Sequence, residues 1–225
     1  MKFHRFEWLI SFIVSVAVAF GQDTNLVQSS PSSDIQNYMH TARHIRVYGG
    51  MALPLGKFGS TNESDSESGF AKSGPAFGFD LNINILDNLA YSMGGLITLN
   101  NISIPQSGTP EIPAGTGSHT GIWIINGLII SRPISETAYV HILAEAGILF
   151  IHTSDIRLIN NGSNYGKNNP ATTSALAYAV GVGMDIGRIS INMRFGGSDP
   201  EYEIIHGVTV HQPTWCLVPS IGIAF

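Results

Sequence analysis

Residues 214–225 read TWCLVPSIGIAF, and their side chains alternate in character with a period of two. One side of this extended segment is apolar and bulky, and the other is mostly small. The bulky set is Phe225, Ile223, Ile221, Leu217 and Trp215, and the small set is Ala224, Gly222, Ser220, Val218 and Cys216. A soluble sandwich would bury the bulky side in a core, whereas a membrane barrel would turn it to lipid. The remainder of the chain has to distinguish these two arrangements.

The composition favours the membrane arrangement. Charged residues make up only 12% of the 225 residues, about half of what soluble domains carry. The formal net charge is −5, which gives no basic footprint for nucleic acid. The single cysteine, Cys216, excludes an intramolecular disulfide and any CxxC metal or redox motif. We therefore expect Cys216 to be a small strand residue, and we expect no cofactor and no nucleic-acid partner.

The amino-terminal residues 1–21 resemble a secretory signal. Lys2 and Arg5 give a positive start, and the 13 mostly apolar residues 8–20 are too few to span a bilayer. Small residues before position 22 suit cleavage there, so we expect an exported chain, with an uncleaved anchor as the alternative. Residues 22–42 are polar and show neither the helical nor the strand periodicity of apolar residues, which predicts a flexible lead-in.

Eight segments of the remaining chain alternate between apolar and small or polar residues. Residues 75–86 show this most plainly, whereas in residues 119–131 the pattern leaves open which side points inward, because Asn126 shares a side with isoleucines and a leucine. Pro54 cannot donate to a ladder, so the first segment is expected to end at Leu53. The predicted strands are 43–53, 75–86, 89–100, 119–131, 137–152, 172–186, 188–196 and 214–225.

The connections between these strands alternate between long and short along the whole chain. Short turns on one rim and long loops on the other are typical of up-and-down barrels in outer membranes, which have an even strand number. An open sheet edge would leave backbone groups unsatisfied in lipid, so the last strand must pair with the first. Residues 43–225 are therefore predicted to form an all-β, eight-stranded antiparallel transmembrane barrel.

The chain is similar to small bacterial outer-membrane β-barrel proteins of the OmpX and OmpA-barrel type. The likeness rests on the signal-like start, the eight strands and the ending IGIAF, and residues 53–59, LPLGKFG, resemble the first-strand ending common in outer membrane protein β-barrel domain families. It implies that Ile221, Ile223 and Phe225 form the signal read by the outer-membrane assembly machinery. It further implies a monomer in the bacterial outer membrane, with lipid and that machinery as partners.

If the apolar sides face lipid, the opposite sides meet inside the barrel. These inward residues are predicted to be Arg46, Asp80, Asn82, Asn84, Glu145, Asp185, Asn192 and Arg194. An eight-stranded barrel is only wide enough for side chains, so we expect an ion-paired, hydrogen-bonded plug. The alternative is a gated path for ions or protons through the same residues.

The expected function is non-enzymatic: the barrel anchors external loops that contact an unidentified partner or stabilise the envelope. The acidic first loop and the third loop, rich in Asn and Gly, disfavour an anionic partner.

The sequence leaves two alternative functions open, and it also suggests one metal site. A soluble lipocalin-like barrel binding an apolar ligand would place Leu176, Tyr178, Val180, Val182 and Met184 inside. A lipid-modifying hydrolase would need His141, Glu145 and Ser154 in contact. A metal site could be drawn through Asp199, Glu201, Glu203, His206 and His211, although their spacing matches no ligand motif, so a solvated loop is expected instead.

Overall fold

The computed structural model describes residues 45–62, 68–104, 114–154, 157–160, 163–167, 171–205 and 208–225. All of the described residues belong to one compact unit of the chain. The predicted signal segment 1–21 and lead-in 22–42 lie outside the described residues. Within the described residues, no helix is long and apolar enough to cross a membrane.

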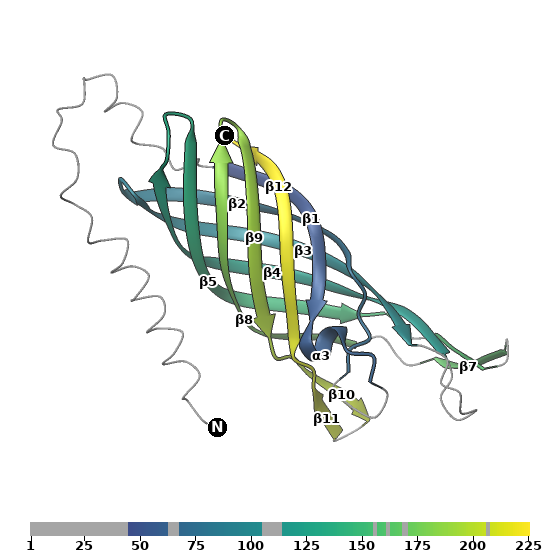
Figure 1. Ribbon diagram of the computed structural model, residues 1–225. Helices are drawn as coiled ribbons and strands as arrows, with labels where there is room; N and C mark the ends of the chain where they lie inside the picture. Colours follow the sequence, from purple (N-terminus) through teal and green to yellow (C-terminus); the bar gives the residue numbers. More distant parts are fainter. Residues whose placement is uncertain are drawn as a thin grey trace, which may run out of the picture. The chain divides into compact units, whose positions relative to one another are not determined.

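Eight long antiparallel strands form a closed ring (Figure 1). They are β1 (Ile45–Leu55), β2 (Gly74–Leu86), β3 (Leu89–Ile104), β4 (Ala114–Pro133), β5 (Ala138–Thr153), β8 (Ala171–Ile186), β9 (Ile189–Ser198) and β12 (Thr214–Ala224). The order around the ring is β1, β2, β3, β4, β5, β8, β9, β12, and β12 pairs with β1. The predicted eight-stranded up-and-down barrel, with long and short connections in alternation, is confirmed.

The pairing register fixes how far the strands tilt. Following hydrogen-bonded partners once around the ring from Ile45 leads back to β1 at Leu55, ten residues further along. A stagger of this size over eight strands tilts them by roughly 40° from the barrel axis, within the usual range. The side chains that alternate along each strand therefore line either the outside or a narrow interior.

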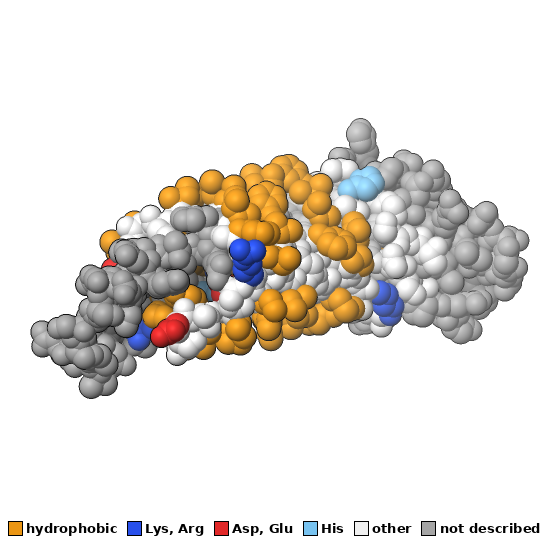
Figure 2. Space-filling view, turned by 90° about the horizontal axis from the view of Figure 1, so that it is seen from above, with side chains coloured by type: hydrophobic (Ala, Val, Ile, Leu, Met, Phe, Trp, Pro, Cys, Tyr) orange, Lys and Arg blue, Asp and Glu red, His pale blue; other side chains and the backbone are white. Residues whose placement is uncertain are grey.

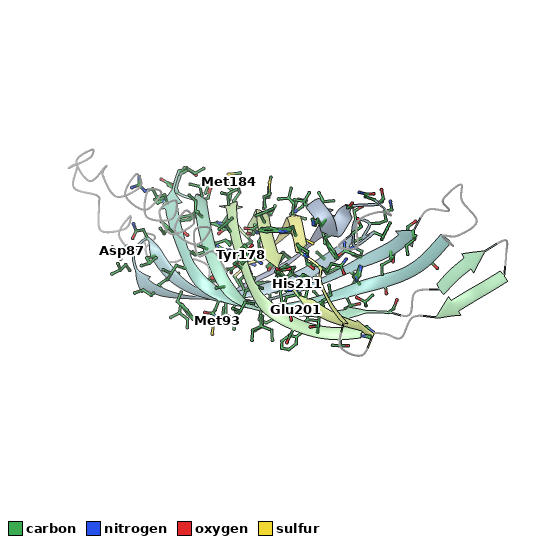
Figure 3. All side chains as sticks on the ribbon, turned by 90° about the horizontal axis from the view of Figure 1, so that it is seen from below. Asp87, Met93, Tyr178, Met184, Glu201 and His211 are labelled. Atoms are coloured by element: carbon green, nitrogen blue, oxygen red, sulfur yellow. The ribbon has the colours of Figure 1, made fainter. Side chains whose placement is uncertain are left out.

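Large apolar side chains cover the outside. On β8, Leu176 is 83% exposed and Val182 is 53% exposed. On the face shown in Figure 2, hydrophobic side chains gather over the strands, and Figure 3 shows Met93 and Met184 projecting from the barrel wall. The lipocalin alternative required the apolar side of residues 172–186 to face inward. That prediction is wrong, because this side faces outward.

The first strand runs further than the sequence predicted. Pro54 lies within β1 and pairs with Cys216 of β12. On its other side, β1 pairs with β2 only as far as Ala52. The missing N–H of Pro54 therefore falls where β1 has already lost one neighbour, which is where a strand tolerates proline. After Leu55 the chain enters the short helix α3 (Gly56–Gly59).

Two segments predicted to be loops contain hairpins. β6 (Arg157–Asn160) pairs with β7 (Ser163–Lys167) and with the far end of β4, and β10 (Glu201–Ile205) pairs with β11 (Val208–His211). Asn, Gly and Ser dominate the first of these segments, so no period of two marked it in the sequence. Both hairpins belong to the rim that carries the long connections.

Candidate functional site

The half of the interior nearer the short turns contains most of the predicted inward charges. Arg194 of β9 forms ion pairs with Asp80 of β2, 3.1 Å from Nη2 to Oδ1, and with Glu145 of β5, 3.1 Å from Nε to Oε2. Its guanidinium also donates to the Tyr48 hydroxyl and lies 5.3 Å from the centroid of that ring. The Tyr48 hydroxyl in turn donates to Asp80 at 3.2 Å. One guanidinium thus joins four strands, β9, β2, β5 and β1, in a buried network.

A second pair lies closer to the turn end. Arg46 Nη2 of β1 contacts Asp185 Oδ2 of β8 at 2.7 Å, and both side chains are buried. His141 of β5 approaches the same carboxylate oxygen at 3.8 Å through Nδ1, and its Nε2 hydrogen-bonds Asn192 Oδ1 at 2.7 Å. Asn192 then donates to Ser190 at 2.9 Å. His141 therefore connects the ion pair to the polar side chains of β9.

Glycines opposite these large polar groups provide the space that they occupy. A Cβ placed on Gly78 would lie 2.5 Å from the Tyr48 ring, and one placed on Gly183 would lie 2.3 Å from both His141 and Asn192. Such distances are shorter than any real Cβ contact, so a side chain at either position would displace the network. The small inward residues of these strands are thus part of the charged site.

The structure places the predicted lumen residues as follows. Arg46, Asp80, Asn82, Glu145, Asp185 and Arg194 are buried, and Asn84 and Asn192 are half-buried. Two guanidiniums, from Arg46 and Arg194, face three carboxylates, from Asp80, Glu145 and Asp185. Charge neutrality in this layer therefore needs one bound proton. Tyr48 and His141 also belong to the network, although the predicted plug omitted them. The sequence carries a signal for both, because each lies an even number of residues from Arg46 or Glu145 on the same strand and so shares its inward side.

Above the charged layer, towards the long loops, the interior is apolar. Trp123 and Ile125 of β4, Leu149 of β5, Leu96 of β3 and Val218 of β12 are buried there in one cluster. The sequence reasoning predicted a polar interior and missed this layer, because β4 and β5 carry apolar residues on both sides. The inward side of β4 holds Trp123, Ile125 and Ile129, and Asn126 faces outward. The orientation that the sequence left open is thereby settled.

The loop end of the interior is covered by α3 and the segment that follows it. Phe58 of α3 is buried and lies 5.2 Å from the His119 ring, centroid to centroid. His119 Nε2 hydrogen-bonds the Gly69 carbonyl at 3.1 Å. Asn100 donates to the carbonyls of Ala52 at 3.2 Å and Lys72 at 2.8 Å. Side chains of β3 and β4 thus hold this segment over the mouth.

The protonation of His119 is set by its surroundings. A carbonyl can only accept, so Nε2 carries the proton, and Nδ1 lies 2.9 Å from the Thr153 hydroxyl, which donates to it. His119 lies beyond Ile122, the last exposed apolar residue of β4 on this side. Burial lowers the pKa of His119 to about 4, against which the hydrogen bond to Gly69 acts weakly. The neutral ring is therefore the form that packs against Phe58.

The other sequence-derived sites are not assembled. His211 contacts Asp199 at 3.7 Å and Glu201 at 3.1 Å, all three side chains are exposed (Figure 3 labels two of them), and the described residues contain no cluster suited to a metal. His206 and the side chain of Glu203 lie outside what is described. The Ser154 hydroxyl accepts the Ser118 N–H at 2.8 Å and follows His141 by thirteen residues along β5 (154 − 141), a span of roughly 40 Å. The hydrolase alternative is wrong about this contact.

The residues of the expected assembly signal lie in one row on the outer side of β12. Ile221, Ile223 and Phe225 are each more than half exposed. Nothing in the described structure covers them.

No protein-family model matches the chain, and no curated protein matches it. Among solved structures, the chain is similar to Ail, the attachment invasion locus protein of Yersinia pestis. That match has 13% identity and a TM-score of 0.46, and it covers 82% of this chain and 100% of that one. A second structure of Ail, in complex with the heparin analogue sucrose octasulfate, matches with 16% identity and a TM-score of 0.43, covering 80% and 97%.

Proposed function

We propose that this chain is a bacterial outer-membrane β-barrel, exported through its amino-terminal segment, which anchors loop structures at the cell surface and has no enzymatic activity. The observation that carries the proposal is the distribution of side chains, with apolar residues outside and paired charges inside. A soluble protein with this surface would expose isoleucines and leucines to water around its whole wall. In lipid the same surface is the stable one.

The height and the borders of the apolar surface support a membrane location. From Leu176 to Ile186 along β8, ten residues at the tilt given above span roughly 25 Å, the height of the apolar band in outer-membrane barrels. Near its loop-side border, Trp215 packs at 5.3 Å against Phe195 and at 5.4 Å against Tyr178, as ring-centroid distances. Aromatic girdles mark this border in membrane barrels. The short turns would then lie in the periplasm.

The interior layers support a closed lumen. Each buried guanidinium is paired with at least one carboxylate, which is how a narrow barrel limits uncompensated charge at its centre. The apolar layer around Trp123 and Leu149 then separates these charges from the mouth, where Phe58 is buried. An ion entering from outside would have to shed its water against apolar side chains. A gated ion path is therefore the weaker candidate.

The long-loop rim supports a surface role. Two hairpins, β6–β7 and β10–β11, project from this rim, and the side chains of Glu201 and His211 are exposed on the second. In this proposal the barrel serves as a rigid anchor for them. The outer row of Ile221, Ile223 and Phe225 acts as the recognition signal during assembly.

Orientation in the membrane can be tested with two cysteine variants. Asp87→Cys lies in the turn between β2 and β3, and Glu201→Cys lies on the opposite rim (both labelled in Figure 3). A membrane-impermeant maleimide added to intact cells is expected to label Glu201→Cys only, whereas both are labelled after lysis. The native Cys216 is 1% exposed and serves as an internal background. Labelling of both variants in intact cells, or of Asp87→Cys alone, would contradict the proposal.

The closed lumen can be tested by conductance in planar bilayers. The unmodified chain is expected to give no single-channel steps. Trp123→Ala removes the largest side chain of the apolar layer, and its neighbour Ile124→Ala, which faces outward, is the matched control. Steps seen with Trp123→Ala but not with Ile124→Ala would locate the seal at this layer. Regular steps from the unmodified chain would refute a closed lumen.

A further inference from the structure

The outer side of β4 carries one polar residue in the middle of its apolar row. Asn126 is exposed, and along the same side it follows Ile122 and Ile124 and precedes Leu128 and Ile130. Two outward apolar residues of β4 thus separate Asn126 from each border of the apolar surface. Its cross-strand neighbours, Met93 on β3 and Ala146 on β5, are also exposed and cannot hydrogen-bond through their side chains as an amide requires. Given the membrane location proposed above, Asn126 faces the acyl chains near the bilayer midplane.

Among the described residues, one of the four hydrogen-bonding positions of this amide is used. The Tyr91 hydroxyl of β3 donates to Asn126 Oδ1 at 3.2 Å. An asparagine oxygen has a second lone pair, and its nitrogen has two hydrogens to donate. Among the described residues, no acceptor for that nitrogen is found. Acyl chains offer neither donors nor acceptors, so an unpaired amide at this depth is costly, and polar groups inside membranes usually have protein partners.

We propose that the β3–β4–β5 side of the barrel is the interface of a homodimer, in which Asn126 of one copy hydrogen-bonds Asn126 of the other. Only a partner with a polar group at the same depth can satisfy the amide. A second copy related by a two-fold axis along the membrane normal brings Asn126 to that depth by symmetry. Each Nδ2 then donates to the partner's Oδ1, whose other lone pair accepts from Tyr91. The resulting ring uses both lone pairs of each Oδ1 and one of the two hydrogens on each Nδ2.

The shape of the outer surface of β3, β4 and β5 allows two copies to approach closely. On β5, Ala144 and Ala146 lie beside Leu128 and Asn126 on the outer side. Small residues at membrane interfaces let backbones come near one another, and interfacial polar side chains then add direct hydrogen bonds. Flexible Met93, on the other flank, adapts to irregular contacts. The proposal departs from the monomer expected from the sequence, and it depends on the membrane location proposed above.

Two methionines give a matched cross-linking test. Met93→Cys places a thiol beside Asn126, and Met193→Cys places one on β9, four strands around the ring from Met93. The native methionines are 40% and 49% exposed. The full chain is reconstituted in phospholipid vesicles at low protein-to-lipid ratio and oxidised or treated with a short bis-maleimide. Each sample is also run boiled and unboiled, so that membrane insertion is scored separately. Asn126→Leu, which keeps the shape and removes the amide, is then added to Met93→Cys.

The expected result is a covalent dimer from Met93→Cys, little or none from Met193→Cys, and roughly tenfold weaker dimerisation after Asn126→Leu, the effect of losing two hydrogen bonds in a membrane. Equal cross-linking of both cysteines, or an inserted Met93→Cys chain that gives no dimer, would overturn the homodimer. An unchanged dimer in the presence of Asn126→Leu would overturn the role of the amide. Failure of the chain to insert would overturn the membrane location instead, which the mobility shift on boiling reports independently.

Discussion

A charge placed at two depths on one strand tests the membrane location directly. Val182 and Leu176 both point outward from β8, and both are more than half exposed. Val182 lies well inside the apolar band, and Leu176 lies six residues nearer the loop end (182 − 176). At the tilt fixed by the strand register, six residues correspond to roughly 15 Å along the membrane normal. Arginine at the two positions therefore samples the bilayer interior and its border.

The two substitutions are expected to differ strongly in cost. Arginine on the lipid face near the midplane of a membrane barrel costs about 2 to 4 kcal/mol, and near the interface about 0 to 1 kcal/mol. Val182→Arg should therefore lower the free energy of unfolding by roughly 2 to 3 kcal/mol more than Leu176→Arg. In water, both substitutions would fall on an exposed surface and change stability by less than about 0.5 kcal/mol.

The assay is equilibrium unfolding by urea in phospholipid vesicles, followed by tryptophan fluorescence. Trp123 reports from the interior and Trp215 from the outer wall. Gel mobility with and without boiling verifies that each variant has inserted. Equal costs at the two positions, or a larger cost for Leu176→Arg, would refute the depth argument.

Three further outcomes are expected. Arg46→Met leaves the Asp185 carboxylate buried without its partner and should cost about 3 to 5 kcal/mol, whereas replacing both residues by apolar ones should cost less, as a double-mutant cycle in urea would measure. The pKa of His119 is about 4 in the folded state, against an ordinary 6.5, so the folded state binds fewer protons between these values. The cover over the mouth should therefore weaken by up to about 3 kcal/mol as pH falls from 6.5 to 4. The expected sign is a smaller protection factor of the Gly69 amide against hydrogen exchange at low pH, and His119→Gln should remove this change. Gly78→Ala should cost about 1 to 3 kcal/mol by forcing the Tyr48 ring aside, and Gly49→Ala, whose Cβ would meet its nearest atom at 3.5 Å, should cost clearly less in the same unfolding assay.

Much of the fold could be predicted from local features of the sequence. The period of two in residues such as 172–186 determines which side chains share a face, and the alternation of short and long connections determines up-and-down topology. The ends of the strands could be predicted less well from the sequence. Pro54 pairs within β1 because its neighbour β2 has already departed, and no local pattern reports where a neighbouring strand stops.

The buried charged residues of the candidate site could be predicted from the sequence, whereas Tyr48, His141 and the contacts among these side chains could not. Arg46 and Asp185 are 139 residues apart in the chain, and Arg194 and Asp80 are 114 apart. Which carboxylate meets which guanidinium depends on the ten-residue stagger around the ring, which is a property of all eight pairings together. The apolar layer at Trp123 was missed for a related reason, since β4 is apolar on both sides and its facing depends on its partners.

The sequence by itself therefore determined the class of fold, the apolar side of most strands and the set of charged residues on the opposite side. These follow from backbone geometry, because alternation along a strand is local. The tertiary structure decided the pairing of those charges, the order of charged and apolar layers, the covering of the mouth by Phe58 and the outward direction of Asn126. These follow from closure of the barrel, which sets the height of each strand against all the others.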